Sequence, residues 1–427
     1  MKRPLALRLL LMPFSPLYRM GLWLHDQMLA WGLEPVRNLK APVVSIGNLS
    51  TGGSGKTPMT IALAEKLLMR GMVIDVLSRG YGRTSIQTLR VRPDGTAAEF
   101  GDEPLLIARR SGVPVYVSPL RFQAGLMAEN DFALEEEARR IETRRAEEEY
   151  LRLIDGMDQA HAEALAEHEK AVHEAAKSAV VATKEKHGPE QATHAAQAEA
   201  HADPEAVALA APTRPPYPPP PPEFKERHLI HILDDGFQHR KLARKVDIVL
   251  LNREDWRDRL LPVGDLREGR EAIQRASVLA IPAEDPTFET VLRKSGWQGP
   301  IWKLRRTMVP PQVQGNVAAF CGIAKPEPFF AGIAAADLKL VACYSFPDHY
   351  NFTQEILTNL IADALKSGAR TMLTTEKDLT RLGKMVELFP ANLPVLPVGL
   401  KIAIEDEGAN LDWLLDRLEI QRSYKRL

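Results

Sequence analysis

One short segment near the N-terminus constrains the fold of this chain more than any other feature. It reads Ser50-Thr51-Gly52-Gly53-Ser54-Gly55-Lys56-Thr57, and it lies between an apolar β-rich run at 42–46 and a helical stretch that continues to residue 68. Strand, glycine-rich loop and helix in this order are the context of a phosphate-binding P-loop. Glycines let backbone N–H groups close on phosphate oxygens, and the helix N-terminus adds the positive end of its dipole. We therefore predict a nucleotide-binding α/β fold.

Two side chains of this loop have chemical roles beyond the backbone. Lys56 is expected to reach the β- and γ-phosphates, and the Thr57 hydroxyl is expected to face Mg²⁺. The strict motif starts with glycine, whereas this chain has Ser50 at that place. The remaining Gly-Lys-Thr between a strand and a helix still predicts a nucleotide site that all eight residues line.

An acidic pair after a later strand completes the nucleotide site. The run 228–233 is apolar enough for a buried strand and ends in Asp234-Asp235-Gly236. P-loop proteins hold Mg²⁺ with a carboxylate at the end of such a strand. Two adjacent acids also occur in turns and helix caps, but together with the P-loop they favour a Mg²⁺ site at Asp234 and Asp235.

Short apolar runs recur along the chain and alternate with helical stretches. This alternation predicts a doubly wound, mostly parallel α/β sheet of the P-loop NTPase type. Runs from about residue 310 onward are expected to form a second, smaller α/β lobe. The predicted strands lie at 42–46, 73–77, 115–118, 228–233, 247–252, 277–281, 317–321, 338–344, 371–374 and 395–398.

Residues 129–226 do not follow this pattern and are interpreted as an insertion. The first part is rich in Ala and Glu and predicts helices that break near Gly156, so a helical hairpin is one possibility. Eight of the eleven residues from Pro212 to Pro222 are proline, which predicts an extended polyproline spacer of about 34 Å. Histidines recur at a spacing of seven, either as a metal-binding stripe or, as we favour, on solvated helix faces: His161 and His168, then His187, His194 and His201.

The first 40 residues combine six basic residues and two acidic ones with an apolar stretch. Arg8, Pro13, Pro16 and Arg19 interrupt that stretch, so no run of about 18 apolar residues could span a bilayer. A signal peptide and a helix packed on its own domain are the alternatives. We favour an amphipathic segment that lies in an anionic membrane surface.

The charge of the chain hides a strong asymmetry. The total is −1, but residues 129–226 hold 22 acidic and 11 basic residues, while the remainder holds 34 acidic and 44 basic ones. The near-neutral total argues against a nucleic-acid binder, and the basic remainder suits anionic lipid and phosphorylated substrates. Two cysteines give no disulfide framework and suit a reducing compartment.

Several motifs, in this order, resemble those of the tetraacyldisaccharide 4'-kinase family of lipid A biosynthesis in Gram-negative bacteria. The resemblance spans roughly 5–128 and 227–420 and leaves the insertion without a counterpart. Its motifs are Ile46-Gly47-Asn48-Leu49 with the P-loop and Pro58, Ser78-Arg79-Gly80-Tyr81-Gly82, Gly101-Asp102-Glu103-Pro104, Asp234-Asp235-Gly236-Phe237-Gln238-His239, Leu261-Pro262-Val263-Gly264 with Leu266-Arg267-Glu268, Phe320-Cys321-Gly322-Ile323, Pro347-Asp348-His349 and Thr374-Thr375-Glu376-Lys377-Asp378.

The resemblance implies a peripheral enzyme at the cytosolic face of the inner membrane. ATP with Mg²⁺ would phosphorylate the 4'-hydroxyl of tetraacyldisaccharide 1-phosphate. The implied organisation is a membrane-associating segment at 1–40, a kinase core at 41–128 and 227–309, the insertion at 129–226, a second lobe at 310–400 and a C-terminal segment at 401–427 that returns to the core.

The resemblance also implies roles for individual residues. Asp102 is the candidate base and His349 its partner, although Asp102 also suits a helix N-cap and His349 an ordinary loop. Glu268 joins the acidic Mg²⁺ shell, directly or through water. The residues implied for the anionic head group, each arginine being by default a surface ion-pair member, are Arg79, Tyr81, Arg121 and Arg267.

A different class of function remains open on the sequence. A membrane-associated nucleotide switch or ATPase would also carry a P-loop, and it would use the proline-rich insertion as a docking arm for an unknown protein. Such a switch has no need for Asp102 and His349, so the sequence favours the kinase.

Overall fold

The computed structural model of the protein describes residues 5–187 and 212–420. The chain divides into two compact units, one made of residues 133–226 and the other of the sequence on either side. The predicted α/β class is confirmed. In the larger unit a single sheet runs in the strand order β10-β9-β11-β12-β8-β7-β6-β1-β5-β2-β4-β3.

The half of this sheet from β8 to β3 is parallel except at its edge strand β3. Its central strand β1 (Val43–Asn48) pairs with β5 (Leu229–Asp234) on one side and β6 (Val246–Leu250) on the other. The parallel order continues through β2 (Val73–Ser78) to β4 (Val115–Val117) and through β7 (Val278–Pro282) to β8 (Ile301–Val309), and β3 (Leu89–Arg90) closes the edge antiparallel to β4. Because parallel strands end at the same edge, β1 and β5 bring the P-loop and the acidic pair together.

Both faces of these strands are buried, as the continuous apolar runs require. Val44 and Ile46 of β1 face a cluster that includes residues of three helices, α3 (Lys56–Met69), α5 (Asp102–Ser111) and α14 (Glu407–Arg417). Val43 points to the opposite face and packs with Leu77 and Leu233. A third cluster combines strand residues with α10 (Pro286–Lys294).

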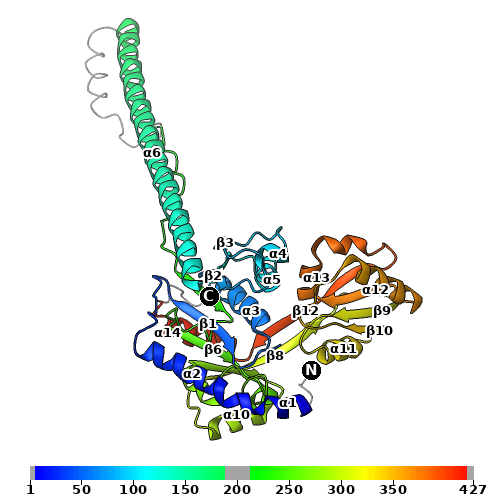
Figure 1. Cartoon of the computed structure of the whole chain (residues 1–427). Coiled ribbons are helices and arrows are strands. Elements are labelled where there is room, and N and C mark those ends of the chain that lie inside the picture. Colours follow the sequence, from blue (N-terminus) through cyan, green and yellow to red (C-terminus); the bar gives the residue numbers. More distant parts are fainter. Residues whose placement is uncertain (1–4, 188–211, 421–427) are drawn as a thin grey trace. The chain divides into compact units, whose positions relative to one another are not determined.

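The second half of the sheet is a continuation of the first, joined by two long strands. The last residues of β8 pair antiparallel with those of β12 (Val395–Ile404), whereas the first residues of β12 pair parallel with β11 (Thr371–Thr375). β9 (Asn316–Cys321) and β10 (Lys339–Ser345) complete this half, and the helices are α11 (Glu327–Ala335), α12 (Gln354–Lys366) and α13 (Glu376–Leu382). Figure 1 shows β8 and β12 between the two halves.

The N-terminal segment is helical and amphipathic. Tyr18 and Leu22 of α2 (Ser15–Ala30) pack against the core, and the Tyr18 hydroxyl donates to the carbonyl of Arg267 at 2.8 Å. No described helix is both long enough and apolar enough to cross a membrane. The remaining short elements are α1 (Leu5–Leu11), η1 (Met12–Phe14), α4 (Ala97–Phe100), α9 (Arg253–Trp256), η2 (Arg270–Arg275) and η3 (Gly383–Leu388).

The expected break near Gly156 is absent. Helix α6 (Arg121–His187) continues through this glycine, because one glycine costs only about 1 kcal/mol in a long run of strong helix formers. The described part of the insertion is therefore not a hairpin with its turn at Gly156. His194 and His201 lie outside the described residues, and within the described ranges no group of three or more His, Cys, Asp or Glu could hold a metal ion.

The proline run packs along its own unit and is not a free spacer. The Tyr150 hydroxyl of α6 donates to the carbonyl of Pro218 at 3.1 Å. The ring of Phe224 lies 5.2 Å from the guanidinium groups of both Arg139 and Arg140. Residues 212–226 have no helical or strand structure, so they return as an extended chain beside the helix.

A buried histidine in β5 ties the sheet to the start of α6. His231 Nδ1 lies 2.7 Å from Asp75 of β2, and Nε2 lies 3.7 Å from Glu129. Glu129 also accepts the N–H of Ala41 at 2.8 Å. Burial opposes the charge on His231, but the two carboxylates outweigh it and raise the pKa of the imidazole to about 9.

We predict that His231→Leu lowers the free energy of unfolding by about 3–5 kcal/mol at pH 7, because the buried Asp75 and the half-buried Glu129 lose their counter-charge. The stabilisation by the imidazolium is complete below its unfolded pKa of about 6.5 and is lost as pH rises through about 9. The difference in unfolding free energy between wild type and variant, measured by urea titration, should therefore be smaller at pH 9.5 than at pH 7. His228→Leu, at an exposed neighbouring position, is the control. A gap that stays constant with pH would contradict this account.

Candidate active site

The P-loop closes at the edge where β1 ends. Gly55, with φ of +86°, precedes the first residue of α3, a backbone that favours glycine. A Cβ at Gly55 would also lie 2.8 Å from Nη2 of Arg306, whose guanidinium donates to the carbonyl of Ser54. Glycine is therefore required here for the turn, and a side chain would also displace the tip of Arg306 of β8.

The first residues of the loop are held by protein contacts. Ser50 is buried, and its hydroxyl donates to Asp255 at 3.0 Å. The N–H of Thr51 donates to the carbonyl of Asp265 at 2.8 Å, and the N–H of Arg267 donates to the carbonyl of Leu49 at 2.7 Å. These contacts fix the entrance of the P-loop.

Lys56 lies against the acidic pair. Its ammonium is 3.1 Å from Oδ1 of Asn48 and 3.5 Å from Oδ1 of Asp235. Asp235 also accepts from Nη1 of Arg267 at 3.0 and 3.1 Å. Burial opposes ionisation of Asp235, but Lys56 and Arg267 outweigh it and lower the pKa of this carboxyl.

The pKa of Asp234 is shifted in the opposite direction to that of Asp235. Asp234 is buried at the end of β5 and accepts from the hydroxyl of Thr60 at 3.1 Å. Burial, followed by the charges of Glu103 and Asp235, raises the pKa of its carboxyl to about 7. A buried carboxylate with so little counter-charge, next to a second carboxylate in the chain, is an oxygen donor set that suits a hard divalent cation.

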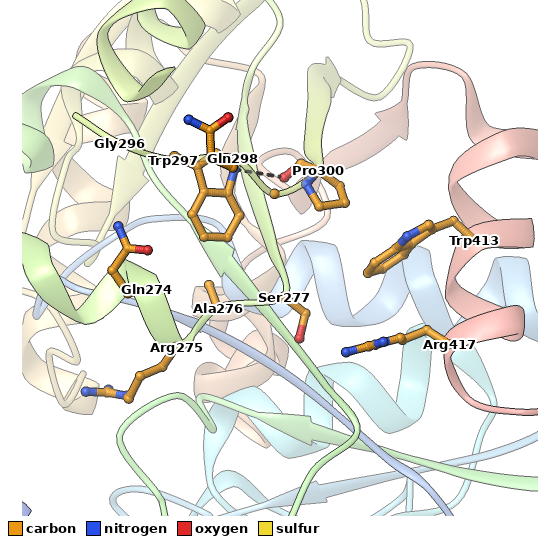
Figure 2. A pocket seen from close by; sticks show the side chains of 11 residues that line it. Gln274, Arg275, Ala276, Ser277, Gly296, Trp297, Gln298, Pro300, Trp413 and Arg417 are labelled. Carbon is orange, nitrogen blue, oxygen red and sulfur yellow. Dashed lines mark hydrogen bonds between the residues drawn. The ribbon is translucent and has the colours of Figure 1, made fainter. Parts of the chain in front are cut away.

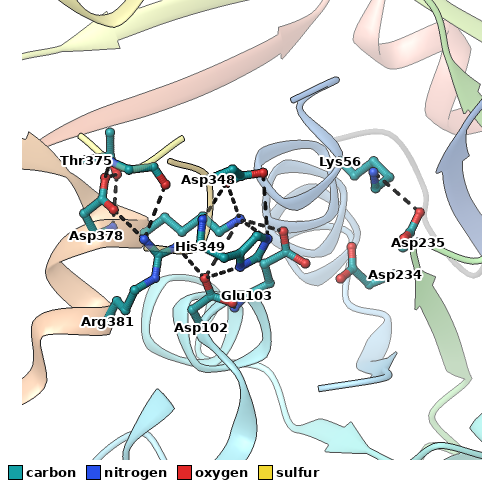
Figure 3. Close-up of polar contacts among 12 residues, drawn as sticks. Lys56, Asp102, Glu103, Asp234, Asp235, Asp348, His349, Thr375, Asp378 and Arg381 are labelled. Atoms are coloured by element: carbon teal, nitrogen blue, oxygen red, sulfur yellow. Dashed lines mark hydrogen bonds and ion pairs between the residues drawn. The ribbon is translucent and has the colours of Figure 1, made fainter. Parts of the chain in front are cut away.

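Asp102 and His349, which are far apart in sequence, are brought together. Nδ1 of His349 lies 3.2 Å from Oδ2 of Asp102 (Figure 3). Asp102 is the first residue of α5, and Gly101 is the N-cap, so the N-cap alternative for Asp102 is wrong. His349 has a φ of +56°, an unusual backbone for a residue other than glycine.

Two cations that we did not predict surround Asp102. Nη2 of Arg381 lies 2.7 Å from Oδ2 of Asp102, and Nζ of Lys377 lies 3.9 Å from the same oxygen. Burial raises the pKa of Asp102, but His349, Lys377 and Arg381 outweigh it and hold the pKa well below its usual range. Lys377 lay within a motif that we recognised, but nothing in the sequence shows that α13 reaches α5.

The predicted head-group residues do not form a single cluster. Arg121, the first residue of α6, is buried with its Nε unpartnered, and burial followed by the charge of Arg79 lowers its pKa to about 10. Tyr81 is exposed, and its ring meets that of His349 edge-on at 5.4 Å. Arg267 is instead paired with Asp235, so it is already neutralised.

The hydrogen bonds of Glu268 are with residues other than Asp234 and Asp235. Glu268 accepts from Gln238 at 3.0 Å and from Arg275 at 2.6 Å. Gln238 in turn accepts from Arg267, the partner of Asp235. Glu268 is thus connected to Asp235 through two side chains, and its place in a Mg²⁺ shell stays a prediction.

A pocket of about 490 Å³ opens at the opposite edge of the sheet, where β7 and β8 begin (Figure 2). Trp297, Trp413 and Arg417 contribute to its lining, and the indole N–H of Trp297 donates to the carbonyl of Pro300. It contains none of the predicted site residues. The P-loop, the acidic pair and the Asp102–His349 pair all belong to the other edge.

Comparison with known proteins decides the family. The family model for tetraacyldisaccharide-1-P 4'-kinase matches residues 7–136 and 223–419. The chain belongs to the tetraacyldisaccharide 4'-kinase family. It is therefore an ATP-dependent kinase of lipid A biosynthesis, as the sequence motifs indicated.

Individual members of the tetraacyldisaccharide 4'-kinase family match over almost the whole chain. The enzyme of Koribacter versatilis is 32% identical over 411 residues, which cover 95% of this chain and 98% of that protein. The Aquifex aeolicus enzyme is 28% identical, covering 91% and 94%. A crystal structure of LpxK from Aquifex aeolicus in complex with ATP aligns with a TM-score of 0.57 at 27% identity, covering 96% of this chain and 99% of that one.

Proposed function

We propose that this kinase transfers the γ-phosphate of ATP to the 4'-hydroxyl of tetraacyldisaccharide 1-phosphate and forms lipid IVA at the cytosolic face of the inner membrane. The observation that carries the proposal is a P-loop lysine and an Asp–His pair at one edge of the sheet. In this proposal Lys56 contacts the transferred phosphoryl group, and Asp102 with His349 receives the proton of the hydroxyl acceptor. Transfer of label from γ-³²P-ATP to this acceptor is the test.

The residues at the end of β5 fit the proposed Mg²⁺ ion. Thr57, Asp234 and Asp235 offer oxygen atoms, and Mg²⁺ is ordinarily bound by one or two carboxylates together with phosphates and water. The ion would neutralise charge on the phosphates. Burial of Asp234 with little counter-charge supports this assignment.

Phosphoryl transfer to a sugar hydroxyl needs positioning, charge stabilisation and a proton acceptor. Lys56 supplies positive charge where the P-loop ends. Asp102 is our candidate proton acceptor, with His349 holding its carboxylate by the Nδ1–H. The cations around Asp102 weaken it as a base, so the pair must lose part of this counter-charge before the proton moves.

The acceptor is an anionic glycolipid, and Arg121 is the residue best suited to its charge. Its guanidinium is buried, and Nε lacks a hydrogen-bond partner within the described chain. Arg79 lies close enough to lower the pKa of Arg121, so the two cations together favour an anion. Tyr81 offers an exposed ring beside His349 for the sugar.

Helix α2 supports the proposed membrane surface. Its outward face exposes Leu17, Met20, Trp23 and Leu24, each by about half of its surface. A groove of about 570 Å³ lies on this segment and is lined by Met12, Ser15, Pro16, Arg19, Met20 and Trp23. An apolar helix face beside basic residues is typical of helices that lie in the membrane interface.

We predict that Leu17→Glu with Trp23→Glu lowers partitioning onto anionic vesicles by at least about tenfold, since two apolar side chains no longer enter the interface. Vesicle sedimentation measures the effect. Tyr18 and Leu22 are unchanged in this variant, so the helix keeps its contacts with the core. Equal sedimentation of both proteins would exclude this face as the membrane contact.

We predict that the insertion is dispensable for catalysis. Arg227 lies 5.7 Å over the ring of Phe132, so a short linker can replace residues 133–226. We expect kcat to stay within about threefold, because insertions that close on themselves are tolerated at exposed sites. A deletion of 129–226 is the informative comparison, since it also removes Glu129 and should be less stable. Loss of activity in the shorter deletion would show that the insertion is integral.

A further inference from the structure

Lys377, the second residue of α13, lies at the centre of the Asp102–His349 pair. Its Nζ is 3.1 Å from Oε1 of Glu103, 3.2 Å from Nε2 of His349 and 3.9 Å from Oδ2 of Asp102. Asp348 lies at 3.9 Å as well, and the side chain is 19% exposed. Figure 3 shows this cluster of acidic side chains beside the imidazole.

The charge on Lys377 is secured by its neighbours. Burial opposes it, but Glu103, Asp102 and Asp348 outweigh the burial and raise the pKa of the amine. An ammonium group has only donors. Nε2 of His349 must therefore accept from Lys377, which leaves the ring proton on Nδ1, the nitrogen that faces Asp102.

This arrangement covers Nε2 of His349 and Oδ2 of Asp102, while Oδ1 of Asp102 accepts the N–H of Glu103 at 3.0 Å. Nε2 is occupied by Lys377, and Oδ2 of Asp102 faces the imidazole and Arg381. Arg381 and Lys377 differ in how freely their side chains can move. Arg381 is fixed between Asp378 at 2.7 Å and Asp102 at 2.7 Å, whereas Lys377 is a compact charge on a flexible stem.

We propose that Lys377 is a positioning residue for phosphoryl transfer, which holds His349 as the Nδ1–H tautomer and keeps the pair covered until an anionic substrate draws the ammonium away. The inference rests on the proposed function. Both proposed substrates carry phosphate, and a phosphate can compete with carboxylates for a lysine through charge-assisted hydrogen bonds. Departure of Lys377 frees Nε2 and removes one positive charge from Asp102.

Kinetics test the proposal through Lys377→Met, which keeps the stem and removes the charge. We expect kcat to fall at least tenfold with KM for ATP within twofold, because His349 is no longer held as the Nδ1–H tautomer. The acidic limb of the kcat profile should move to higher pH, because a cation next to the pair is lost. Lys377→Arg should return the acidic limb of the kcat profile most of the way to its wild-type pH. Lys366→Met, on the exposed face of α12, is the matched control. The groups that face His349 are Asp102, Asp348, Lys377 and the ring of Tyr81. Behind them, Arg381 pairs with Asp102 and Glu103 pairs with Lys377.

Nitrogen NMR of the His349 ring gives a readout that does not depend on turnover. With ¹⁵N-histidine and a His349→Gln sample to assign the signal, the wild-type enzyme at pH 7.5 should show the Nδ1–H tautomer, and Lys377→Met should lose it. An unchanged tautomer, or an unchanged kcat and pH profile, overturns the proposal. If no kinase activity is found while the tautomer shifts as expected, the proposed function fails and the positional contact stands.

Discussion

Lys56→Ala is expected to lower kcat by about 10²–10³-fold, because the P-loop ammonium is the positive charge nearest the proposed phosphoryl site. Asn48 at 3.1 Å and Asp235 at 3.5 Å hold the ammonium group at the loop, and these two contacts use fewer than its three N–H donors. The variant leaves Asp235 paired with Arg267, so the fold should persist. Steady-state kinetics with saturating acceptor measure the effect.

Lys66→Ala is the matched control for this variant. It removes a lysine from the same helix, where the ammonium pairs with Glu407 at 3.0 Å on the surface. Surface pairs of this kind contribute about 0–1 kcal/mol, so activity should not change. Equal turnover of Lys56→Ala and Lys66→Ala would mean that Lys56 does not contact the transferred group.

Asp102→Asn is expected to lower kcat by about 10²–10⁴-fold while the Kd for ATP changes little. Asparagine keeps the shape of the side chain and can still meet His349, but it cannot take a proton. Single-turnover rates and ATP binding on the same preparation separate the two effects.

The Asp102 variant also changes an ion-pair cluster, so stability must be measured beside activity. Arg381 and Lys377 would lose one of their counter-charges, although Asp378 and Glu103 remain. Asp94→Asn, at an exposed position before α4, is the control for loss of one carboxylate. If Asp102→Asn keeps its melting temperature and its kcat, the base role is refuted.

Most strands were predictable because they are short runs of apolar residues, several of them buried on both faces. β8 was not, since Arg305, Arg306 and Thr307 are exposed in its second half and the run lacks a continuous apolar pattern. That strand pairs with β12, so the joining of both halves into one sheet was hidden as well. A strand with such a mixed, partly exposed pattern gives little local signal, and its pairing with β12 depends on packing.

The parts of the candidate site that lie in local sequence motifs were predictable, and the parts that depend on contacts between distant segments were not. The P-loop and the acidic pair follow from local patterns, and Asp102 with His349 follows from the family resemblance. Arg381 reaches Asp102 across 279 residues, and Lys377 reaches Glu103 across 274. No pattern in the sequence indicates which face of α13 turns toward α5, so these cations needed the structure.

The central claim is that this chain phosphorylates a glycolipid and does not merely hydrolyse ATP. The most direct measurement incubates the full chain with γ-³²P-ATP, Mg²⁺ and tetraacyldisaccharide 1-phosphate, with Lys56→Ala as the blank, and follows label in the extracted lipid. The account predicts a labelled lipid whose new phosphate is on the 4'-oxygen and whose yield depends on Lys56. Release of labelled inorganic phosphate with no labelled lipid would contradict it and would favour a nucleotide switch.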